Sequence, residues 1–547
     1  MLPPPDIRGV YRSDARARAC YAEGAGIYRI IPSAVAVPAD VADLRQLVCW
    51  AAEHRAALIP RGAGSAMGGG NVGDGVIVDL TRLKERVLSI VPDSRRATAA
   101  AAVTLAELNA AAQSHGLRLP PDPSSGRWAT LGGMVATNAA GARSVRYGSV
   151  RRWVEALTLL TADAETIMLR RGAKSTRASS SALDRFTRNA LPAIQESASL
   201  IRSRFPKTRK NSSGYALDAY LASGDVLDLI IGAEGTLGIV TEIEWRLDPI
   251  PRYRAGLRIA LGSLDQLSAL IEAMSSVEPS ALELLDRSFL ELLNDETLAA
   301  AGISLNEAEA VLLMELERDD ADALRDAVES AATRAKLLAY SVDSAFSASA
   351  ALRLWELRHA ASPILAGLPV ERRSLQVIED ACVPIAAVSE YIKEVRRASA
   401  RRGLPVVIFG HAGDGHIHVN LLPDVTRLGW ERQVVSLLEE VTAIVVRLGG
   451  TPSGEHGDGR LRAAALAQVY GPEILRLFRL VKDSFDPLGI FNPGIILPSG
   501  EPAISRLKVG PAAAQVPEDI GRALREIERS GGYAQSRLEL AGESRES

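Results

Sequence analysis

The segment Pro60-Arg-Gly-Ala-Gly-Ser-Ala-Met-Gly-Gly-Gly70 decides the fold of the first half of the chain. It follows Ala57-Leu-Ile-Pro60, which predicts a short strand running into a loop. Glycines let backbone N–H groups approach an anion closely, so such a loop can hold a diphosphate group. It is not a P-loop, because no Gly-Lys-Ser/Thr follows. It is not a Rossmann fingerprint either, because no amphipathic helix and acidic residue follow at the required places. Taken alone, the segment is equally compatible with a flexible hairpin loop.

Two further glycine clusters lie in the same half. Pro120-Pro-Asp-Pro-Ser-Ser-Gly126 is followed by Ala129-Thr-Leu-Gly-Gly-Met-Val-Ala-Thr-Asn138 and Gly141. The third cluster, Gly232-Ala-Glu-Gly-Thr-Leu-Gly238, runs into a strand-like segment. Because all three clusters stand beside Thr, Ser or Asn, one large polar ligand explains them better than three separate turns.

The elements around these loops mix helices and strands without a regular βαβ period. A helix is predicted over residues 41–55 after Asp40 as its cap, and a strand over residues 76–80. Residues 154–160 and 165–169 predict a hairpin. A proline-rich break, Asp248-Pro-Ile-Pro251, ends this half.

The second half predicts an α+β layer in which helices cover a sheet. Strands such as residues 310–315 alternate with helices such as residues 321–337, and further helices are expected over 427–448 and 463–485. Asn492-Pro-Gly494 is expected to close the folded part, with one helical patch over 520–527 before a frayed polar end. The expected organisation is 1–30 extension, 31–250 ligand-binding domain, 251–450 cap, 451–500 returning segment and 501–547 polar tail.

Composition excludes several classes of protein. The 547 residues are 47% apolar and 24% charged, which is globular and not disordered. Three cysteines are too few for a disulfide framework, a structural zinc knot or an iron–sulfur cluster held by this chain alone. A net charge of −3 argues against nucleic-acid binding. Without a membrane span or a secretory signal in the sequence, we expect a cytoplasmic protein, and peripheral membrane contact is compatible with this.

Four of the seven histidines fall between residues 411 and 456. Residues 405–421 predict a strand, a glycine turn and a second strand, so His411 and His418 can converge across a hairpin, and His416 can share a face with His418. Ser453-Gly-Glu-His-Gly-Asp-Gly459 adds an adjacent carboxylate and imidazole. Two His and one Glu suit Zn²⁺, Mn²⁺ or Fe²⁺ with open positions for a substrate. A lone His would more often be a hydrogen-bonded core or turn residue.

The three glycine clusters resemble the FAD-binding domain of the vanillyl-alcohol oxidase / p-cresol methylhydroxylase superfamily in order and spacing. The resemblance implies a two-part FAD-binding domain and an α+β substrate cap whose antiparallel sheet is covered by helices. It implies non-covalent FAD, because Ala63 and its neighbours include no His where some members attach the cofactor. The residues that it places at FAD are Arg61, Gly62, Ala63, Gly64, Ser65, Met67, Gly68, Pro121, Asp122, Thr130, Gly132, Gly133, Asn138, Gly141, Tyr147, Glu234, Gly235, Gly238, Ile239, Val240 and Asn492.

The second half resembles the FAD-linked D-2-hydroxyacid dehydrogenases, a group with D-lactate dehydrogenase, D-2-hydroxyglutarate dehydrogenase and the flavin subunit of glycolate oxidase. The resemblance lies in the motif from His411 to His418, in Gly454-Glu-His-Gly457 and in Phe485-Asp-Pro-Leu-Gly-Ile-Phe-Asn-Pro-Gly494. It implies that His411, His418 and Glu455 bind a divalent metal, zinc before manganese or iron, and that His456 is the catalytic base. His416 stands where the family often has Asn, and it would add a ligand or bind substrate.

Trp355-Glu-Leu-Arg358 resembles the W-x-x-R element of the same family. An Arg fork binds a carboxylate with two hydrogen bonds, so Arg358 is the expected substrate anchor, with Ser362 one helical turn further. The alternative is a surface salt bridge of small energetic value. Residues 376–384 lack the Lys that some 2-hydroxyglutarate enzymes supply to a second carboxylate, and Arg372 or Arg373 could replace it.

The expected reaction is oxidation of a D-2-hydroxy acid to the 2-oxo acid, with His456 taking the hydroxyl proton and the hydride passing to flavin N5. Reduced FAD would pass its electrons to an external quinone, cytochrome, electron-transfer flavoprotein or iron–sulfur subunit. A homodimer is compatible with the sequence. Two alternatives stay open: a flavin oxidase of a non-carboxylate alcohol, and a catalytically silent FAD-binding subunit of a multi-protein oxidase.

Overall fold

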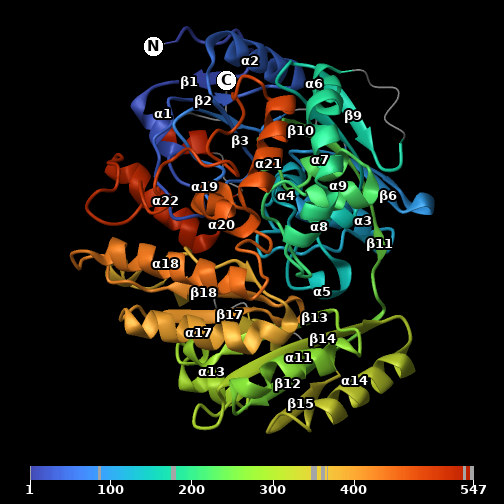
Figure 1. The fold of residues 1–547 in the computed structure, drawn as a ribbon. Helices are drawn as coiled ribbons and strands as arrows, with labels where there is room; N and C mark the ends of the chain where they lie inside the picture. The colour runs from blue at the N-terminus through green and yellow to red at the C-terminus, as the bar shows by residue number, and fades with distance from the viewer. Residues whose placement is uncertain are drawn as a thin grey trace.

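The computed structural model describes residues 2–83, 88–173, 180–346, 354–358, 364–365, 367–533 and 537–542. Two groups of sheets divide them (Figure 1). We call residues 253–448, which form one large sheet and its helices, the cap, and the remaining described residues the body. In Figure 1 the body is the upper part and the cap the lower part.

The first body sheet carries the strand that leads into the first glycine loop. Its order is β1 (Val10–Arg12), β2 (Ala34–Val37), β4 (Val76–Asp79) and β3 (Leu58–Arg61), with β4 parallel to both β2 and β3. Helix α2 (Val41–His54) connects β2 to β3 along the chain. The Asp40 side chain caps this helix by accepting a hydrogen bond from the Asp43 N–H. The predicted helix and both predicted strands are confirmed.

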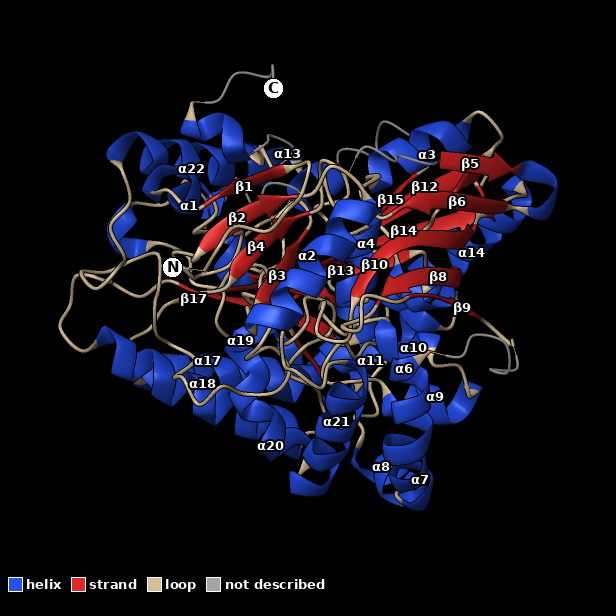
Figure 2. Cartoon of the chain, turned by 90° about the horizontal axis from the view of Figure 1, so that it is seen from above, coloured by secondary structure: helices blue, strands red, loops and turns tan. Residues whose placement is uncertain are grey.

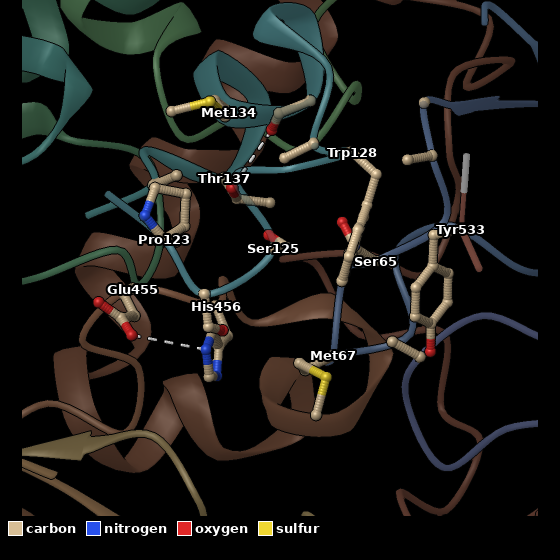
Figure 3. Close-up of a pocket in the computed structure, with 18 of the residues that line it drawn as sticks. Ser65, Met67, Pro123, Ser125, Trp128, Met134, Thr137, Glu455, His456 and Tyr533 are labelled. Carbon is tan, nitrogen blue, oxygen red and sulfur yellow. Dashed lines mark hydrogen bonds and ion pairs between the residues drawn. The ribbon is translucent and has the colours of Figure 1, made fainter. Parts of the chain in front are cut away.

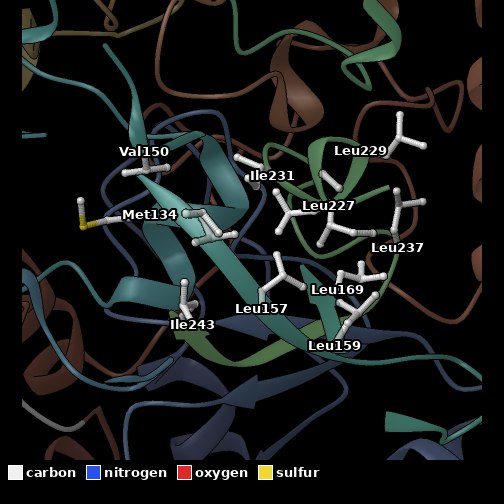
Figure 4. Packing of buried hydrophobic residues seen from close by; sticks show 14 of the residues in the cluster. Met134, Val150, Leu157, Leu159, Leu169, Leu227, Leu229, Ile231, Leu237 and Ile243 are labelled. Atoms are coloured by element: carbon white, nitrogen blue, oxygen red, sulfur yellow. The ribbon is translucent and has the colours of Figure 1, made fainter. Parts of the chain in front are cut away.

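The second body sheet is antiparallel (Figure 2), and the third glycine cluster leads directly into its strand β10 (Ile239–Arg246). Its order is β5 (Leu88–Val91), β6 (Arg96–Ala100), β10, β8 (Val154–Leu160) and β9 (Thr166–Arg170), so the predicted hairpin is confirmed. Figure 4 shows Leu157 and Leu159 of this sheet packed with Leu227 and Ile231. The other helices of this half are α3 (Leu105–Gln113), α4 (Leu131–Thr137), α5 (Ser144–Tyr147), α6 (Ser181–Arg185), α7 (Leu191–Glu196), α8 (Ala198–Arg204), α9 (Leu217–Ser223) and α10 (Leu227–Ile230).

The cap is a seven-stranded antiparallel sheet covered by helices, as predicted. Its order is β15 (Ser341–Ala345), β12 (Tyr253–Leu261), β14 (Ala310–Arg318), β13 (Ala281–Asp286), β17 (Val406–His411), β18 (His416–Leu421) and β16 (Ala381–Cys382). Its longer helices are α11 (Leu267–Ser275), α14 (Ala321–Ala335), α17 (Val388–Arg401) and α18 (Trp430–Arg447), and its shorter ones are α12 (Arg287–Leu290) and α13 (Asp295–Ala300).

Alternation along the cap strands separates its core from a polar face. Ile417, Val419 and Leu421 of β18 belong to the apolar cluster shared with the helices. Because successive side chains of a strand point to opposite faces, His416, His418 and Asn420 lie on the other face. The same alternation places Glu283 of β13 and Glu315 and Glu317 of β14 there, and all three are fully buried.

Buried ion pairs on this polar face join the cap to the body. Arg143 of the body donates from Nε to Glu315 Oε1 at 2.7 Å and from Nη2 to Oε2 at 3.0 Å. Glu317 Oε2 accepts from Arg118 at 2.9 Å and from the Tyr147 hydroxyl at 2.6 Å. These contacts fix the face that carries the histidines against the glycine loops.

After the cap, the chain returns to the body through α19 (Gly459–Arg462), α20 (Leu466–Tyr470) and α21 (Pro472–Phe485). The prediction of one helix over 463–485 is wrong. Gly471 has φ +82°, a conformation that ends α20, and Pro472 starts α21 at its first position, where a missing N–H costs nothing.

The described chain stays packed beyond Gly494, contrary to prediction. Helix α22 (Glu518–Ser530) contains the predicted patch, and its Ile520 and Leu524 pack with Tyr21, which follows α1 (Ala15–Cys20). Figure 1 shows α22 and α1 side by side. Residues 543–547 of the predicted polar end lie outside the described residues. Within the described ranges, no helix is both long and apolar enough to cross a membrane.

Candidate functional site

A cavity of about 940 Å³ lies between the body and the cap. All three glycine clusters line it, and so do the cap's polar face and the end of α22. Figure 3 shows its walls: Ser65 and Met67 from the first loop, Pro123, Ser125 and Thr137 from the second region, and Glu455 and His456 from the segment after the cap. The cavity therefore gathers the two predicted sites, for FAD and for metal and substrate, into one space.

At the start of the first loop, Arg61 lies in the cavity wall and holds the surrounding backbone in place. Its guanidinium donates to the backbone carbonyls of Tyr21 at 3.2 Å, Glu23 at 2.8 Å and Asn71 at 3.3 Å. Burial lowers its pKa to about 10. Gly64 has φ +82°, and a Cβ there would stand 2.5 Å from Arg61 Nη2, so the loop requires glycine at this position.

The second and third clusters meet the returning segment. Thr130 caps α4, its Oγ1 accepting from the Gly133 N–H at 3.3 Å, which turns this helix start toward the cavity. Glu234, at φ +51°, accepts from the N–H groups of Asp458 at 2.8 Å and Gly459 at 3.0 Å. Burial and the neighbouring Asp458 carboxylate raise the pKa of Glu234 to about 8. Glu234 thus ties the third glycine cluster to the segment that carries His456.

Most residues predicted to bind FAD line the cavity. They are Arg61, Gly62, Ala63, Gly64, Ser65, Met67, Asp122, Thr130, Gly132, Gly133, Glu234, Gly235, Gly238, Ile239 and Val240. Their roles at FAD stay predictions. The structure does bring them together: residues from separate segments between 61 and 240 line one cavity.

Six predicted cofactor residues do not line the cavity, and five of them support its walls. Tyr147 donates its hydroxyl to Glu317 in the cap, and Asn492 donates to the carbonyls of Gly70 and Glu234, both at 2.8 Å. The other four are Pro121, Gly68, whose carbonyl accepts from Leu461, Asn138, which ends α4 at φ +51°, and Gly141, whose carbonyl accepts from Ser144.

The three predicted metal ligands converge. His411 Nε2 lies 3.2 Å from Glu455 Oε1 and 3.4 Å from His418 Nε2, and His418 Nε2 lies 3.8 Å from the same Glu455 oxygen. All three side chains are buried. Such a triangle of two imidazole nitrogens and one carboxylate oxygen is a set that divalent transition metals accept.

Outer hydrogen bonds orient these ligand atoms. His411 Nδ1 faces Glu283 Oε1 at 2.7 Å, and His418 Nδ1 faces the Glu379 carbonyl at 2.7 Å, so in each ring Nε2 is the nitrogen left toward the triangle. Histidine ligands of metals are typically held in this way. The residues present therefore fit a metal by donor type, convergence and support.

His416 has a different environment, which the sequence did not reveal. Its Nε2 faces Asp380 Oδ1 at 2.9 Å, and its Nδ1 lies 3.4 Å from Lys210 Nζ. Burial and the Lys210 charge lower the pKa of His416 to about 3, so its ring stays neutral. Lys210 also contacts Glu455 Oε2 at 3.0 Å, and this cation helps hold the pKa of Glu455 well below its usual value. Neither Lys210 nor Asp380 stood out in the sequence.

His456 is held by a buried carboxylate pair. Its Nδ1 lies 2.7 Å from Glu379 Oε2, and its N–H donates to Asp380 Oδ2 at 3.0 Å. Burial opposes protonation, but Glu379 and Asp380 outweigh it and raise the pKa of His456 to about 10. Its Nε2 lies 3.6 Å from Glu455 Oε1, beside the ligand triangle. The segment 376–384, whose sequence has no lysine, supplies both carboxylates.

Arg358 lies in the cavity wall, where the sequence placed the substrate anchor. Its Nε donates to Glu283 Oε2 at 2.6 Å, and its guanidinium stacks over Phe409 at 4.8 Å. Glu283 therefore orients both Arg358 and His411. Ser362 lies outside the described residues, and Arg372 is exposed and does not line the cavity. Arg373 does line it and pairs with Glu528 of α22.

The end of α22 forms a wall that sequence reasoning missed. Tyr533, just after this helix, packs against Trp128 with tilted rings whose centroids lie 5.8 Å apart, and both line the cavity (Figure 3). A Cβ at Gly531 would stand 2.6 Å from the Trp128 ring. The only available signal was the amphipathic pattern of residues 520–527, which predicts a helix but not its partner.

Comparison with known proteins agrees with this geometry. Residues 32–170 match the family described as FAD binding domain, and residues 250–496 match the family described as FAD linked oxidases, C-terminal domain. The chain is 31% identical over 468 residues to D-lactate dehydrogenase of Archaeoglobus fulgidus, across 85% of this chain and 91% of that protein. It is 29% identical over 470 residues to glycolate oxidase subunit GlcD of Bacillus subtilis, across 85% and 89%. With D-2-hydroxyglutarate dehydrogenase of Pantoea ananatis it shares 28% identity over 86% of this chain and 48% of that protein.

Solved structures confirm the predicted fold. A 4-ethylphenol oxidase from Gulosibacter chungangensis superimposes with a TM-score of 0.65 at 16% identity, over 89% of this chain and 94% of that one. A p-cresol methylhydroxylase superimposes with a TM-score of 0.64 at 14% identity, over 90% and 95%. The family matches and the sequence relatives establish that the chain belongs to the FAD-linked oxidases and is an FAD-linked oxidoreductase of the D-lactate dehydrogenase, D-2-hydroxyglutarate dehydrogenase and glycolate oxidase type.

Proposed function

We propose that the protein oxidises a D-2-hydroxy acid to the 2-oxo acid, with His456 as the base and a divalent metal held by His411, His418 and Glu455. One observation carries the proposal. The ligand triangle, the base and Arg358 all line the cavity that the glycine clusters line. Oxidation of such an acid needs a cation for its carboxylate, a base and a metal for its hydroxyl, and a flavin for the hydride from Cα. All of these partners must lie within one cavity.

Each side chain has a task that follows from its contacts. Arg358, oriented by Glu283, offers its outer nitrogens to the substrate carboxylate. In its neutral form, His456 takes the hydroxyl proton at Nε2, because Glu379 engages Nδ1. A divalent cation in the ligand triangle, one of whose carboxylate oxygens lies 3.6 Å from Nε2, would lower the pKa of about 10 that the carboxylates give this ring and so favour that neutral form. Glu379 and Asp380 stabilise the imidazolium that forms, as a buried carboxylate does for the histidine of a catalytic triad.

Two groups bound by these residues complete the chemistry. The glycine clusters would hold FAD, which accepts the hydride when bound. The triangle would hold a divalent metal, which lowers the pKa of an oxygen bound to it. Zinc is the first choice for two imidazoles and a carboxylate, with manganese or iron as alternatives.

Electrons must leave the flavin for an acceptor outside this chain. Cys20, Cys49 and Cys382 are free thiols, and three of them cannot provide the four thiolates of an iron–sulfur cluster. We therefore propose a separate quinone, cytochrome, electron-transfer flavoprotein or iron–sulfur subunit as the acceptor.

Anaerobic bleaching of the flavin absorption tests the proposal. We expect bleaching by D- but not by L-2-hydroxy acids, its loss after treatment with EDTA, and its recovery when a divalent metal is returned. Bleaching that is unchanged after EDTA has removed all bound metal would contradict the metal's role. Absence of bleaching by every D-2-hydroxy acid would contradict the whole proposal.

His456→Gln tests the base. The variant should bind FAD normally, but its rate of flavin reduction should fall by about 10²–10⁴-fold, the usual contribution of a general base. His115→Gln is the matched control, because His115 is exposed and does not line the cavity. Undiminished reduction in His456→Gln would place the base elsewhere.

A further inference from the structure

The C-terminal end of α22 brings a carboxylate into the cavity. Glu528 lines the cavity together with Arg529, Ser530, Gly531 and Tyr533. All of them lie beyond residue 496, where the match to the FAD-linked oxidase family ends. The Glu528 carboxylate contacts the Arg373 guanidinium through Oε2 and Lys508 Nζ through Oε1, the latter at 2.9 Å. The chain thus places a carboxylate of its own on an arginine of the cavity wall.

Arg373 lies on the side of the cavity that carries the proposed metal ligands. His418 and Asn420 share a face of β18, where alternate residues stand about 7 Å apart. Ser374 donates its hydroxyl to Asn420 Oδ1 at 3.1 Å, and Leu375 pairs with Leu421. Since His418, Asn420, Ser374 and Arg373 all line the cavity, they form a continuous wall that runs from the ligand triangle to Arg373.

The charge and burial of Glu528 show that it neutralises Arg373. An arginine in such a wall would bind a carboxylate at the far end of a substrate whose first carboxylate lies at the triangle and Arg358. Glu528 neutralises it instead. The side chains of Arg373 and Glu528 are only 19% and 24% exposed, and Lys508, at 2% exposed, holds the second oxygen of Glu528. A pair shielded in this way is screened far less by solvent than a surface ion pair.

We propose that Glu528 occupies the position of a second substrate carboxylate and thereby selects 2-hydroxy acids with one carboxylate over those with two. This inference rests on the proposed function. A dicarboxylate would bring its second negative charge beside Glu528 and find Arg373 already paired. A monocarboxylate with an apolar end has no second charge, so it is not repelled by Glu528 and does not need Arg373 as a partner.

The test compares two substrates of equal chain length, D-2-hydroxyglutarate and D-2-hydroxypentanoate, in wild type and Glu528→Gln. The wild type should prefer the pentanoate. In Glu528→Gln, the ratio of kcat/KM for hydroxyglutarate to kcat/KM for hydroxypentanoate should rise at least about tenfold, the value of one charge-assisted hydrogen bond. The change should appear in KM for hydroxyglutarate, whereas a merely structural loss would affect both substrates alike.

Two further variants identify the cause. In Glu528→Gln combined with Arg373→Gln, the gain for hydroxyglutarate should disappear, because the freed guanidinium is gone. Glu526→Gln is the matched control, since Glu526 is exposed on the same helix and does not line the cavity. An equal gain in Glu526→Gln would overturn the inference.

Wild-type binding gives a test that needs no variant. Pentanoate and glutarate lack the hydroxyl and are not oxidised, so perturbation of the flavin spectrum reports their binding. Pentanoate should bind the holoenzyme more tightly than glutarate. Tighter binding of glutarate, or a substrate ratio that is unchanged in folded Glu528→Gln, would overturn the inference while leaving the proposed function standing. Absence of flavin reduction by every 2-hydroxy acid would overturn the proposed function, and this inference with it.

Discussion

His416 shows how the task of a single side chain is set by its neighbours. Its position beside His418 in the sequence suggested a further ligand or a substrate contact. In the structure its two nitrogens face Asp380 and Lys210, and it is fully buried. Glu379 and Asp380, which hold His456, carried no recognisable motif. A sequence reveals residue types and spacing, but the partner of a hydrogen bond is chosen by strands and loops that meet only after folding.

The buried carboxyl of Glu234 should make the stability of the fold depend on pH. Its pKa is raised from the ordinary 4.5 to about 8, so between these values the folded chain keeps a proton that the unfolded chain releases. The free energy of unfolding should therefore fall as pH rises through this window, by up to ~1.4 kcal/mol per pH unit from this group. Glu234→Gln cannot titrate and should flatten the fall.

Urea unfolding of the holoenzyme at about pH 5 and about pH 8 measures the effect. The difference between the two midpoints should be smaller in Glu234→Gln than in wild type. Equal differences would mean that Glu234 does not carry the proton. Glu278→Gln is a control, because that carboxyl is exposed.

At the scale of elements, periodicity predicted well wherever one face of an element is apolar. The hairpin of β17 and β18 and the helices α2, α14 and α18 occur where the pattern placed them. Helices α20 and α21 were predicted as one, because their apolar spacing continues across Gly471. The Gly471-Pro472 pair marks the break, because the glycine takes a positive φ that ends α20 and the proline starts α21.

The packing of helix α21 in the body should contribute measurably to the free energy of unfolding. Phe478 is fully buried and makes edge contacts with Tyr215 and Tyr470, at centroid distances of 5.5 and 5.4 Å. Phe478→Ala should lower the free energy of unfolding of the body by ~3–5 kcal/mol, the cost of a large cavity. Thermal melting monitored by circular dichroism checks this. Phe346→Ala, at a phenylalanine that is 54% exposed, is the matched control and should leave the melting temperature nearly unchanged.

For the whole molecule, the buried ion pairs between cap and body decide whether the cavity keeps its shape. The Glu315 carboxylate in the cap accepts hydrogen bonds from Arg143 of the body and, at 3.1 Å, from the indole N–H of Trp355. It therefore joins the body and the cap to the helical turn that carries Arg358. Glu315→Ala leaves a buried cation without one of its partners, and such losses cost ~3–5 kcal/mol. We expect a lower melting temperature and faster proteolysis between body and cap.

The control for Glu315→Ala is Asp322→Ala. Asp322 pairs with Arg325 at 2.8 Å, but the two side chains are 80% and 59% exposed. Exposed pairs contribute only ~0–1 kcal/mol. Equal destabilisation by the two substitutions would show that the buried pair does not hold the cap to the body.

The sequence by itself predicted the two-part fold, the gathering of the glycine clusters and the convergence of His411, His418 and Glu455, whose role as metal ligands stays a prediction. Each depends on local spacing: glycines where the backbone must turn or approach closely, and alternate residues that share one strand face. Tertiary structure alone decided that Lys210, Glu283, Glu379 and Asp380 orient His411, Glu455 and His456, and that Glu528 meets Arg373 in the cavity wall. These contacts join residues from 76 to 245 positions apart, and no local pattern encodes which distant charge a buried group will meet.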